Sequence, residues 1–87
     1  MNEHTDTFKT NVKHYIEKEL VADQTLRLKD DDDLLIGDTL DSLGVMRLVE
    51  YIEKLLDIRI PPEDITIDNF QSVGKIHEYV SHKFARL

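Results

Sequence analysis

Apolar side chains recur every three or four residues along three segments of the chain, and each recurrence predicts an amphipathic helix. The first segment runs from about Thr5 to Leu20, the second from Ser42 to Leu56, and the third from Val73 to about Arg86. The three apolar stripes consist of Phe8, Val12, Tyr15, Ile16 and Leu20; Val45, Leu48, Val49, Ile52, Leu55 and Leu56; and Val73, Ile76, Val80, Phe84 and Leu87. We therefore expect three helices around one core.

Two connections join these helices, and both carry apolar anchors. Residues 21–41 include Leu26, Leu28, Leu34, Leu35, Ile36 and Leu40, so this long connection should be pinned to the core rather than disordered. Residues 57–72 leave room for a short helical turn near Thr66 to Phe70, with Ile60, Ile65 and Phe70 as anchors. No strand-like alternation persists. The predicted fold is an all-α bundle of three main helices and one short helix, with a long loop between the first two.

Polar residues that can cap a helix stand where the apolar patterns begin. The side-chain oxygen of such a residue accepts a hydrogen bond from a backbone N–H that has no partner within the helix. Pro61 and Pro62 follow the second helix and cannot continue it. The candidate caps are Thr5 or Asp6 for the first helix, Asp38, Asp41 or Ser42 for the second, and Ser72 for the third.

The composition narrows the class of protein. A chain of 87 residues without cysteine predicts a single domain, with an ordered core over about residues 5–84, that has neither a disulfide nor a thiolate metal site. No apolar run approaches the roughly 18 residues of a membrane span, and the polar N-terminus lacks the apolar segment of a signal peptide. We therefore expect a soluble, cytoplasmic monomer that does not insert into membranes.

Negative charge is concentrated in one half of the chain. Residues 30–64 hold eleven acidic and three basic side chains, a net charge of −8, whereas the remaining residues net +1. This field disfavours nucleic acid and would attract basic protein surfaces, although a simple solubility role explains it equally well.

Neither the acidic run nor the histidines have the spacing of a metal site. The residues around Asp30–Asp33 fail the calcium-loop pattern in both possible registers, since apolar side chains occupy ligand positions. We interpret the run as a solvated loop. His4, His14, His77 and His82 also lack ligand spacing, so no metal is predicted.

Ser42 is the remaining candidate for chemistry. Its neighbourhood, Leu-Asp-Ser-Leu-Gly, is not a nucleophile elbow and follows no strand, so we do not expect an enzyme. A helix cap is the simplest role for a serine at this position. However, Leu43 and Met46 lie on the outward side of the predicted helix, where a cap alone needs no apolar neighbours. A helix N-terminus also favours an attached phosphate.

The stretch "DSLGVMRLVEYIEKLLDIRIPPEDITIDNFQSVGKI" resembles the acyl carrier protein family. The resemblance includes Asp41-Ser42-Leu43 at the start of a helix, the following Ile60-Pro61, and Ser72-Val73 at the start of the last helix. It implies that a phosphopantetheinyl transferase moves 4′-phosphopantetheine from coenzyme A to Ser42. Acyl or aminoacyl cargo would then be held as a thioester on the terminal thiol of the arm.

The resemblance also implies partner enzymes: a loading ligase or synthetase and downstream transferases. Their basic surfaces would dock on the second helix and the loop before it. The residues expected to contact them are Asp38, Asp41, Leu43, Met46, Arg47, Glu50 and Glu53.

The details favour a specialised pathway over housekeeping fatty acid synthesis. Carriers of fatty acid synthesis usually have acids at the positions of Gly44 and Arg47. The prediction is thus an acyl carrier of a specialised lipid or secondary-metabolite pathway. The alternatives are an aminoacyl or peptidyl carrier of a nonribosomal-type pathway, which the Ser-Leu-x-x-x-Arg-Leu pattern resembles, and an unmodified acidic helical interaction module.

Overall fold

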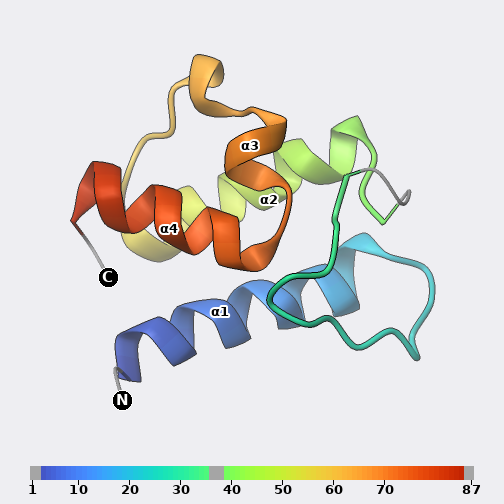
Figure 1. The fold of residues 1–87 in the computed structure, drawn as a ribbon. Coiled ribbons are helices and arrows are strands. Elements are labelled where there is room, and N and C mark those ends of the chain that lie inside the picture. Colours follow the sequence, from blue (N-terminus) through green and yellow to red (C-terminus); the bar gives the residue numbers. More distant parts are fainter. Residues whose placement is uncertain (1–2, 36–38, 86–87) are drawn as a thin grey trace.

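The computed structural model describes residues 3–35 and 39–85, with side chains from residue 7 onward, and these residues form helices and no strand (Figure 1). The α-helices are α1 (Glu3–Tyr15), α2 (Ser42–Leu56), α3 (Ile67–Phe70) and α4 (Val73–Phe84). A π-helical turn, η1 (Ile16–Leu20), extends α1, and a 3₁₀ turn, η2 (Pro62–Asp64), precedes α3. The predicted all-α bundle of three main helices and one short helix is confirmed.

The core is formed by the predicted apolar stripes. α1 packs against both α2 and α4, and α3 packs against α4. Val12, Ile52 and Ile76, one from each long helix, are completely buried. The stacked rings of Tyr15 and Tyr51, with centroids 4.1 Å apart, add a contact between α1 and α2. Among the described residues, the apolar periodicity therefore identified the packing faces correctly, with one exception on α2 that is described below; Leu87, predicted in the third stripe, lies outside the described residues.

The start of the first helix differs from the prediction. The backbone is already helical at Glu3, so Thr5 and Asp6 lie inside the first turns and the caps predicted there are wrong. At the other end, the π-helical turn ends at Val21, which is extended (φ −120°, ψ 148°).

The other helix boundaries agree closely with the prediction. α2 spans Ser42–Leu56 as expected and ends at Asp57, which adopts the left-handed conformation (φ 54°). Thr66 and Ser72 cap α3 and α4 by accepting hydrogen bonds from Asn69 N–H and Lys75 N–H. α4 ends at Phe84, two residues before the predicted end. Sequence-local capping chemistry explains all of these boundaries.

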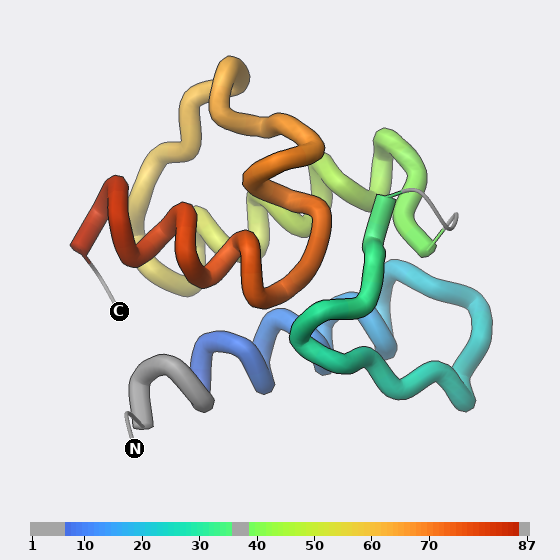
Figure 2. Tube along the Cα trace, in the orientation of Figure 1, coloured from blue at the N-terminus to red at the C-terminus, as the bar shows by residue number. Residues whose placement is uncertain are grey.

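The long connection between α1 and α2 is pinned to the bundle, as predicted. Leu28, Leu34 and Leu40 are buried in the core, whereas Ile36 lies outside the described residues. The connection passes beside the junction of α3 and α4 (Figure 2), where Leu34 N–H donates to Gln71 O (2.8 Å) and Gly74 N–H donates to Asp30 O (2.8 Å). These contacts fix the chain on its way to the start of α2.

Gly74 permits this close approach. A Cβ atom at position 74 would lie 3.3 Å from Asp30 O, which is tighter than ordinary van der Waals contact. The structural role of Gly74 is to let the connection lie against the N-terminus of α4.

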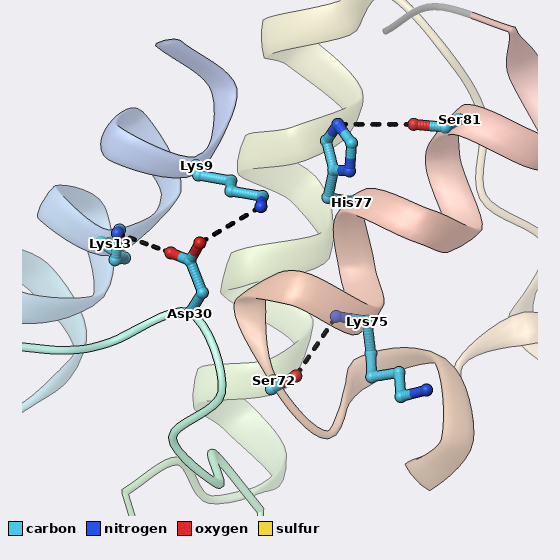
Figure 3. A network of polar contacts seen from close by, with 7 residues as sticks. All are labelled: Lys9, Lys13, Asp30, Ser72, Lys75, His77 and Ser81. Atoms are coloured by element: carbon cyan, nitrogen blue, oxygen red, sulfur yellow. Dashed lines mark hydrogen bonds and ion pairs between the residues drawn. The ribbon is translucent and has the colours of Figure 1, made fainter. Parts of the chain in front are cut away.

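Asp30–Asp33 lie in a loop that is partly open to solvent, in line with the interpretation, but three of the four carboxylates also form specific contacts that the sequence did not predict. The Asp30 carboxylate accepts from Lys13 Nζ (2.7 Å) and Lys9 Nζ (3.1 Å), which joins the connection to α1 (Figure 3). Asp32 accepts from Lys29 N–H, and Asp33 accepts from Leu35 N–H and from the Gln71 side chain. Asp31 alone of the four is exposed. The acidic run therefore shapes the connection, because nearby donors stabilise its charges.

We expect the contacts of Asp30 to stabilise the fold above pH 4. The hydrogen bond from Lys13, with help from Lys9, holds the pKa of Asp30 below its ordinary value of 3.8. A lowered carboxyl pKa gives stability that is present above the unfolded-state pKa and is lost as pH falls through the folded-state pKa. Asp30→Asn should therefore lower the free energy of unfolding at pH 7 by about 0.5 to 1 kcal/mol, as for a partly exposed ion pair. The difference should close as pH falls through the lowered folded-state pKa of Asp30.

Urea titrations of both proteins at several pH values would measure this difference. Asp31→Asn is the matched control, because it removes the same charge from an exposed neighbour. A loss of stability that is equal in the two variants, or that persists at low pH, would contradict a role for the Asp30–lysine contacts.

Candidate functional site

The candidate site lies where the long connection enters α2. Asp41 is the N-cap: its backbone is extended (φ −91°, ψ −177°), and its Oδ1 accepts from Gly44 N–H at 2.7 Å. Its carbonyl oxygen accepts from Val45 N–H at 2.9 Å. Of the capping residues considered, Asp41 therefore performs this function, and Ser42 becomes the first residue of the helix.

The Ser42 side chain is exposed and is not needed to close the helix. Among the side chains of residues 7–35 and 39–85, none forms a hydrogen bond with its hydroxyl group. A hydroxyl in this position can be reached by another enzyme. A phosphate attached to it would also lie at the positive end of the dipole of a 15-residue helix. The residues present thus fit the phosphopantetheine group that the sequence resemblance implies.

Gly44 and Leu40 hold this site against the core. Leu40 is buried, with 5% of its surface exposed. A Cβ atom at Gly44 would lie 3.3 Å from Asp41 Oδ1 and 3.4 Å from Leu40 Cδ2. The glycine therefore gives room for both the cap and the core anchor.

The outward face of α2, where we predicted contacts with partner enzymes, is largely exposed to solvent. Leu43 and Met46 leave 62% and 54% of their surfaces in solvent, so this face carries two large exposed apolar side chains. Arg47, Glu50 and Asp41 are exposed beside them. Asp38, also predicted to contact partners, lies outside the described residues. The exposed residues combine an apolar pair with charges of both signs, as interfaces commonly do.

Glu53 has a structural contact that the sequence did not predict. It is half-buried, and its Oε2 accepts from Ile60 N–H at 2.8 Å, so it ties the end of α2 to the following loop. Its contact with partner enzymes remains a prediction, and its carboxylate already accepts a hydrogen bond from Ile60 N–H.

Leu55 is the one member of the α2 stripe whose predicted burial is wrong, since 38% of its surface is exposed. It lies at the edge of the stripe and in the last turn, where neighbouring helices give less cover.

Ile67 is an exposed apolar residue that the pattern did not identify. It begins α3 and leaves 59% of its surface in solvent. A helix of four residues is too short for periodicity to show which of its side chains face outward.

The described residues contain no group of three or more histidine or acidic side chains arranged to hold a metal ion. His77, half-buried on α4, lies beside Phe8 and within 3.5 Å of Ser81 Oγ, whereas His14 and His82 are exposed. In the part of the chain that the structure describes, no helix has the length and apolar character needed to cross a membrane.

Comparison with known proteins agrees with the family resemblance that the sequence shows. A family model described as a phosphopantetheine attachment site matches residues 16–80. The D-alanyl carrier proteins of Streptococcus sanguinis (strain SK36) and Streptococcus thermophilus (strain LMD-9) are each 35% identical over 51 residues, which cover 59% of this chain and 65% of each relative. The D-alanyl carrier protein of Streptococcus uberis is 36% identical over 50 residues, which cover 58% of this chain and 63% of the relative. The chain thus spans slightly less than two thirds of the curated relatives it matches.

Proposed function

This chain belongs to the phosphopantetheine attachment site family, and from that premise we propose that it is an aminoacyl carrier whose arm is attached to Ser42. As a member of the family, it carries a covalently attached 4′-phosphopantetheine group and is a carrier rather than an enzyme. When attached, this group supplies a flexible arm with a terminal thiol on which cargo is held as a thioester.

The attachment site is assigned to Ser42 because of one observation: Asp41 caps α2, which leaves the adjacent serine hydroxyl exposed and without a hydrogen-bonding partner among the described side chains. The serine is held at a defined place by the Asp41 cap, by buried Leu40 and by the close contact at Gly44. The α2 N-terminus would stabilise the negative charge of the phosphodiester.

The proposed docking face for partner enzymes is the outward side of α2. It offers Leu43 and Met46 as apolar anchors, with Asp41, Arg47 and Glu50 around them. A phosphopantetheinyl transferase and a loading ligase would each need to reach Ser42 across this face. Asp38 and Glu53 remain proposed members of the same surface.

An aminoacyl cargo is favoured over other acyl groups by two observations. The relatives at 35–36% identity are named D-alanyl carrier proteins. In addition, Leu43, Arg47 and Leu48 follow the serine in the Ser-Leu-x-x-x-Arg-Leu pattern that resembles aminoacyl and peptidyl carriers. We propose that residues 1–87 form a single carrier domain that acts as a monomer in the cytoplasm.

The proposal predicts that coenzyme A and a promiscuous phosphopantetheinyl transferase will add one phosphopantetheinyl mass to the protein. Intact-mass analysis of protein purified from its native host should then detect the same addition plus an amino acid, because the thioester preserves the cargo mass. A different acyl mass would overturn the choice of cargo but leave the carrier function intact. Protein that stays unmodified with several transferases would contradict the attachment itself and favour an unmodified interaction module.

A further inference from the structure

The connection between α1 and α2 turns back after η1 and runs alongside it (Figure 2). Residues 24–28 thereby form one wall of a groove of about 700 Å³, and α1 with η1 forms the other wall. No lining residue belongs to α2 or to residues 39–41, so this groove is separate from the face around Ser42. We call it the basic groove, because Lys13, Lys18 and Arg27 line it.

The sign of its charge sets the basic groove apart in a protein with a net charge of −7. It is lined by three basic side chains, one histidine and one acidic side chain. In three other grooves the acids outnumber the bases: between α3 and α4, beside Asp41, and at the C-terminal end of α2. A cationic lining in an acidic protein is not explained by solubility, and it attracts a negatively charged ligand.

The charges on the α1 side of the groove are only partly compensated. Glu17 Oε2 accepts from Leu28 N–H at 2.7 Å, so the acid of the groove is engaged in holding the two walls together. Lys13 Nζ donates to Asp30 at 2.7 Å and retains two further N–H donors. Lys18 is exposed and forms no ion pair with another described residue. An anionic group that enters the groove therefore meets donors that lack an anion of their own.

Arg27 supplies the positive charge of the opposite wall. Its Nη1 donates to Gln24 O (3.3 Å) and Leu26 O (2.8 Å). These carbonyl groups are neutral, so they position the guanidinium group without cancelling its charge. A guanidinium group has five N–H donors in a planar fork, and the remaining donors suit a carboxylate in particular.

We propose that the basic groove binds an extended, acidic peptide segment of a partner protein. The wall from Thr10 to Lys18 is about 12 Å long at a helical rise of about 1.5 Å per residue. This length matches about four residues of an extended chain. Side chains on one side of an extended chain repeat every 7 Å or so, which is close to the rise between Lys13 and Lys18. Two acidic side chains, two positions apart, would thus reach both lysines, with Arg27 on the facing wall.

A single phosphate group or a lipid surface fits these observations less well. The cations are spaced along the groove on long side chains, whereas sites for one phosphate bring backbone N–H groups together at one point. An anionic membrane would repel a protein with a net charge of −7, and it cannot enter a groove. Charge and shape together therefore favour an acidic peptide.

A segment bound in the basic groove would leave Ser42 free. The carrier would be held by an acidic segment on one side, while the outward face of α2 receives enzymes with basic surfaces. Such a tether raises the effective concentration of the carrier near its partner and so increases the overall affinity without a new contact at α2. The tether does not require the arm, so it is independent of the attachment at Ser42.

A blocked tetraglutamate peptide tests the proposal. Titrated into isotope-labelled protein, with and without the arm, it should shift the NMR signals of residues 10–18 and 24–28, and added salt should weaken its binding. Arg27→Glu should weaken the binding by about fivefold or more, since it replaces an attraction by a repulsion. Lys18→Glu, on the other wall, should do the same, which separates loss of charge from a local change in the connection. Lys54→Glu is the matched control: Lys54 is exposed on α2 outside the groove, so this variant should bind nearly as the wild type does.

Shift changes that avoid the groove, or equal weakening in Arg27→Glu and Lys54→Glu, would overturn the proposal. Tighter binding of inorganic phosphate than of the peptide at the same residues would overturn the choice of a peptide. Binding to phosphatidylglycerol vesicles that Arg27→Glu abolishes would overturn it in favour of a membrane. None of these results would affect the attachment at Ser42, which mass analysis tests separately.

Discussion

Ser42→Ala should abolish the addition of phosphopantetheine and leave the stability of the fold nearly unchanged. The first effect is expected because alanine has no hydroxyl to form the phosphodiester. The second follows from the position of the serine, which is exposed and does not cap α2, since Asp41 Oδ1 accepts from Gly44 N–H. Exposed substitutions of this kind change the free energy of unfolding by about 0.5 kcal/mol or less. Intact-mass analysis and thermal melts of the same samples would measure both quantities.

Ser72→Ala is the matched control and should give the opposite result. Ser72 is the N-cap of α4, is 7% exposed, and accepts from Lys75 N–H at 3.2 Å. Its removal should cost about 1 kcal/mol of stability, as for other serine caps, while the addition to Ser42 proceeds. If Ser42→Ala still gained the phosphopantetheinyl mass, the assignment of the attachment residue would be wrong. If it melted as early as Ser72→Ala, the serine would have a structural role.

Leu34→Ala should be strongly destabilising, although the residue lies in the connection and not in a helix. Leu34 is completely buried, and its backbone N–H donates to Gln71 O at 2.8 Å, so its side chain fills the core beside the α3–α4 junction. Truncation of a buried leucine leaves a cavity and costs about 3 kcal/mol or more. A domain of this size has a total stability of roughly 4 to 13 kcal/mol, so urea denaturation should show a large fall in midpoint.

Leu43→Ala makes the same chemical change on the surface and is the natural comparison. Because 62% of Leu43 is exposed, its truncation should leave the urea midpoint almost unchanged. It should instead slow the addition of phosphopantetheine, since Leu43 is proposed to contact the transferase. Equal denaturation midpoints for Leu34→Ala and wild type would show that the connection is not part of the core.

Much of the fold could be predicted because its determinants are local in sequence. α2 begins at Ser42 and ends at Leu56 as expected, since an apolar stripe, a polar residue before its first turn and prolines beyond its end all lie within one segment. The Ser72 cap was predicted in the same way, whereas the cap at Thr66 was not predicted. Exposure of Leu43 and Met46 was also predicted, because helical geometry alone directs them away from the core stripe.

Other features could not be predicted, because they depend on atoms far apart in the chain. The pairing of Asp30 with Lys9 and Lys13 joins residues 17 and 21 positions apart, so the sequence predicted the loop but not these contacts. The close approach of Gly74 to Asp30 O likewise joins residues that are distant in sequence, so it exists only after the connection has packed against α4. The basic groove is another such feature, since its walls come from residues 10–18 and 24–28.

The sequence by itself determined that this protein is a helical carrier with a serine at the start of its second long helix, because periodicity, capping and the motif around Ser42 are properties of short segments. Only the tertiary structure decided which residue caps that helix and how the long connection is held. It also placed residues 24–28 alongside α1, where they complete the basic groove. The reason is physical: several side chains near Ser42 were able to act as the cap, and the packing of Leu40 and Gly44 favours the geometry in which Asp41 does so and Ser42 remains exposed.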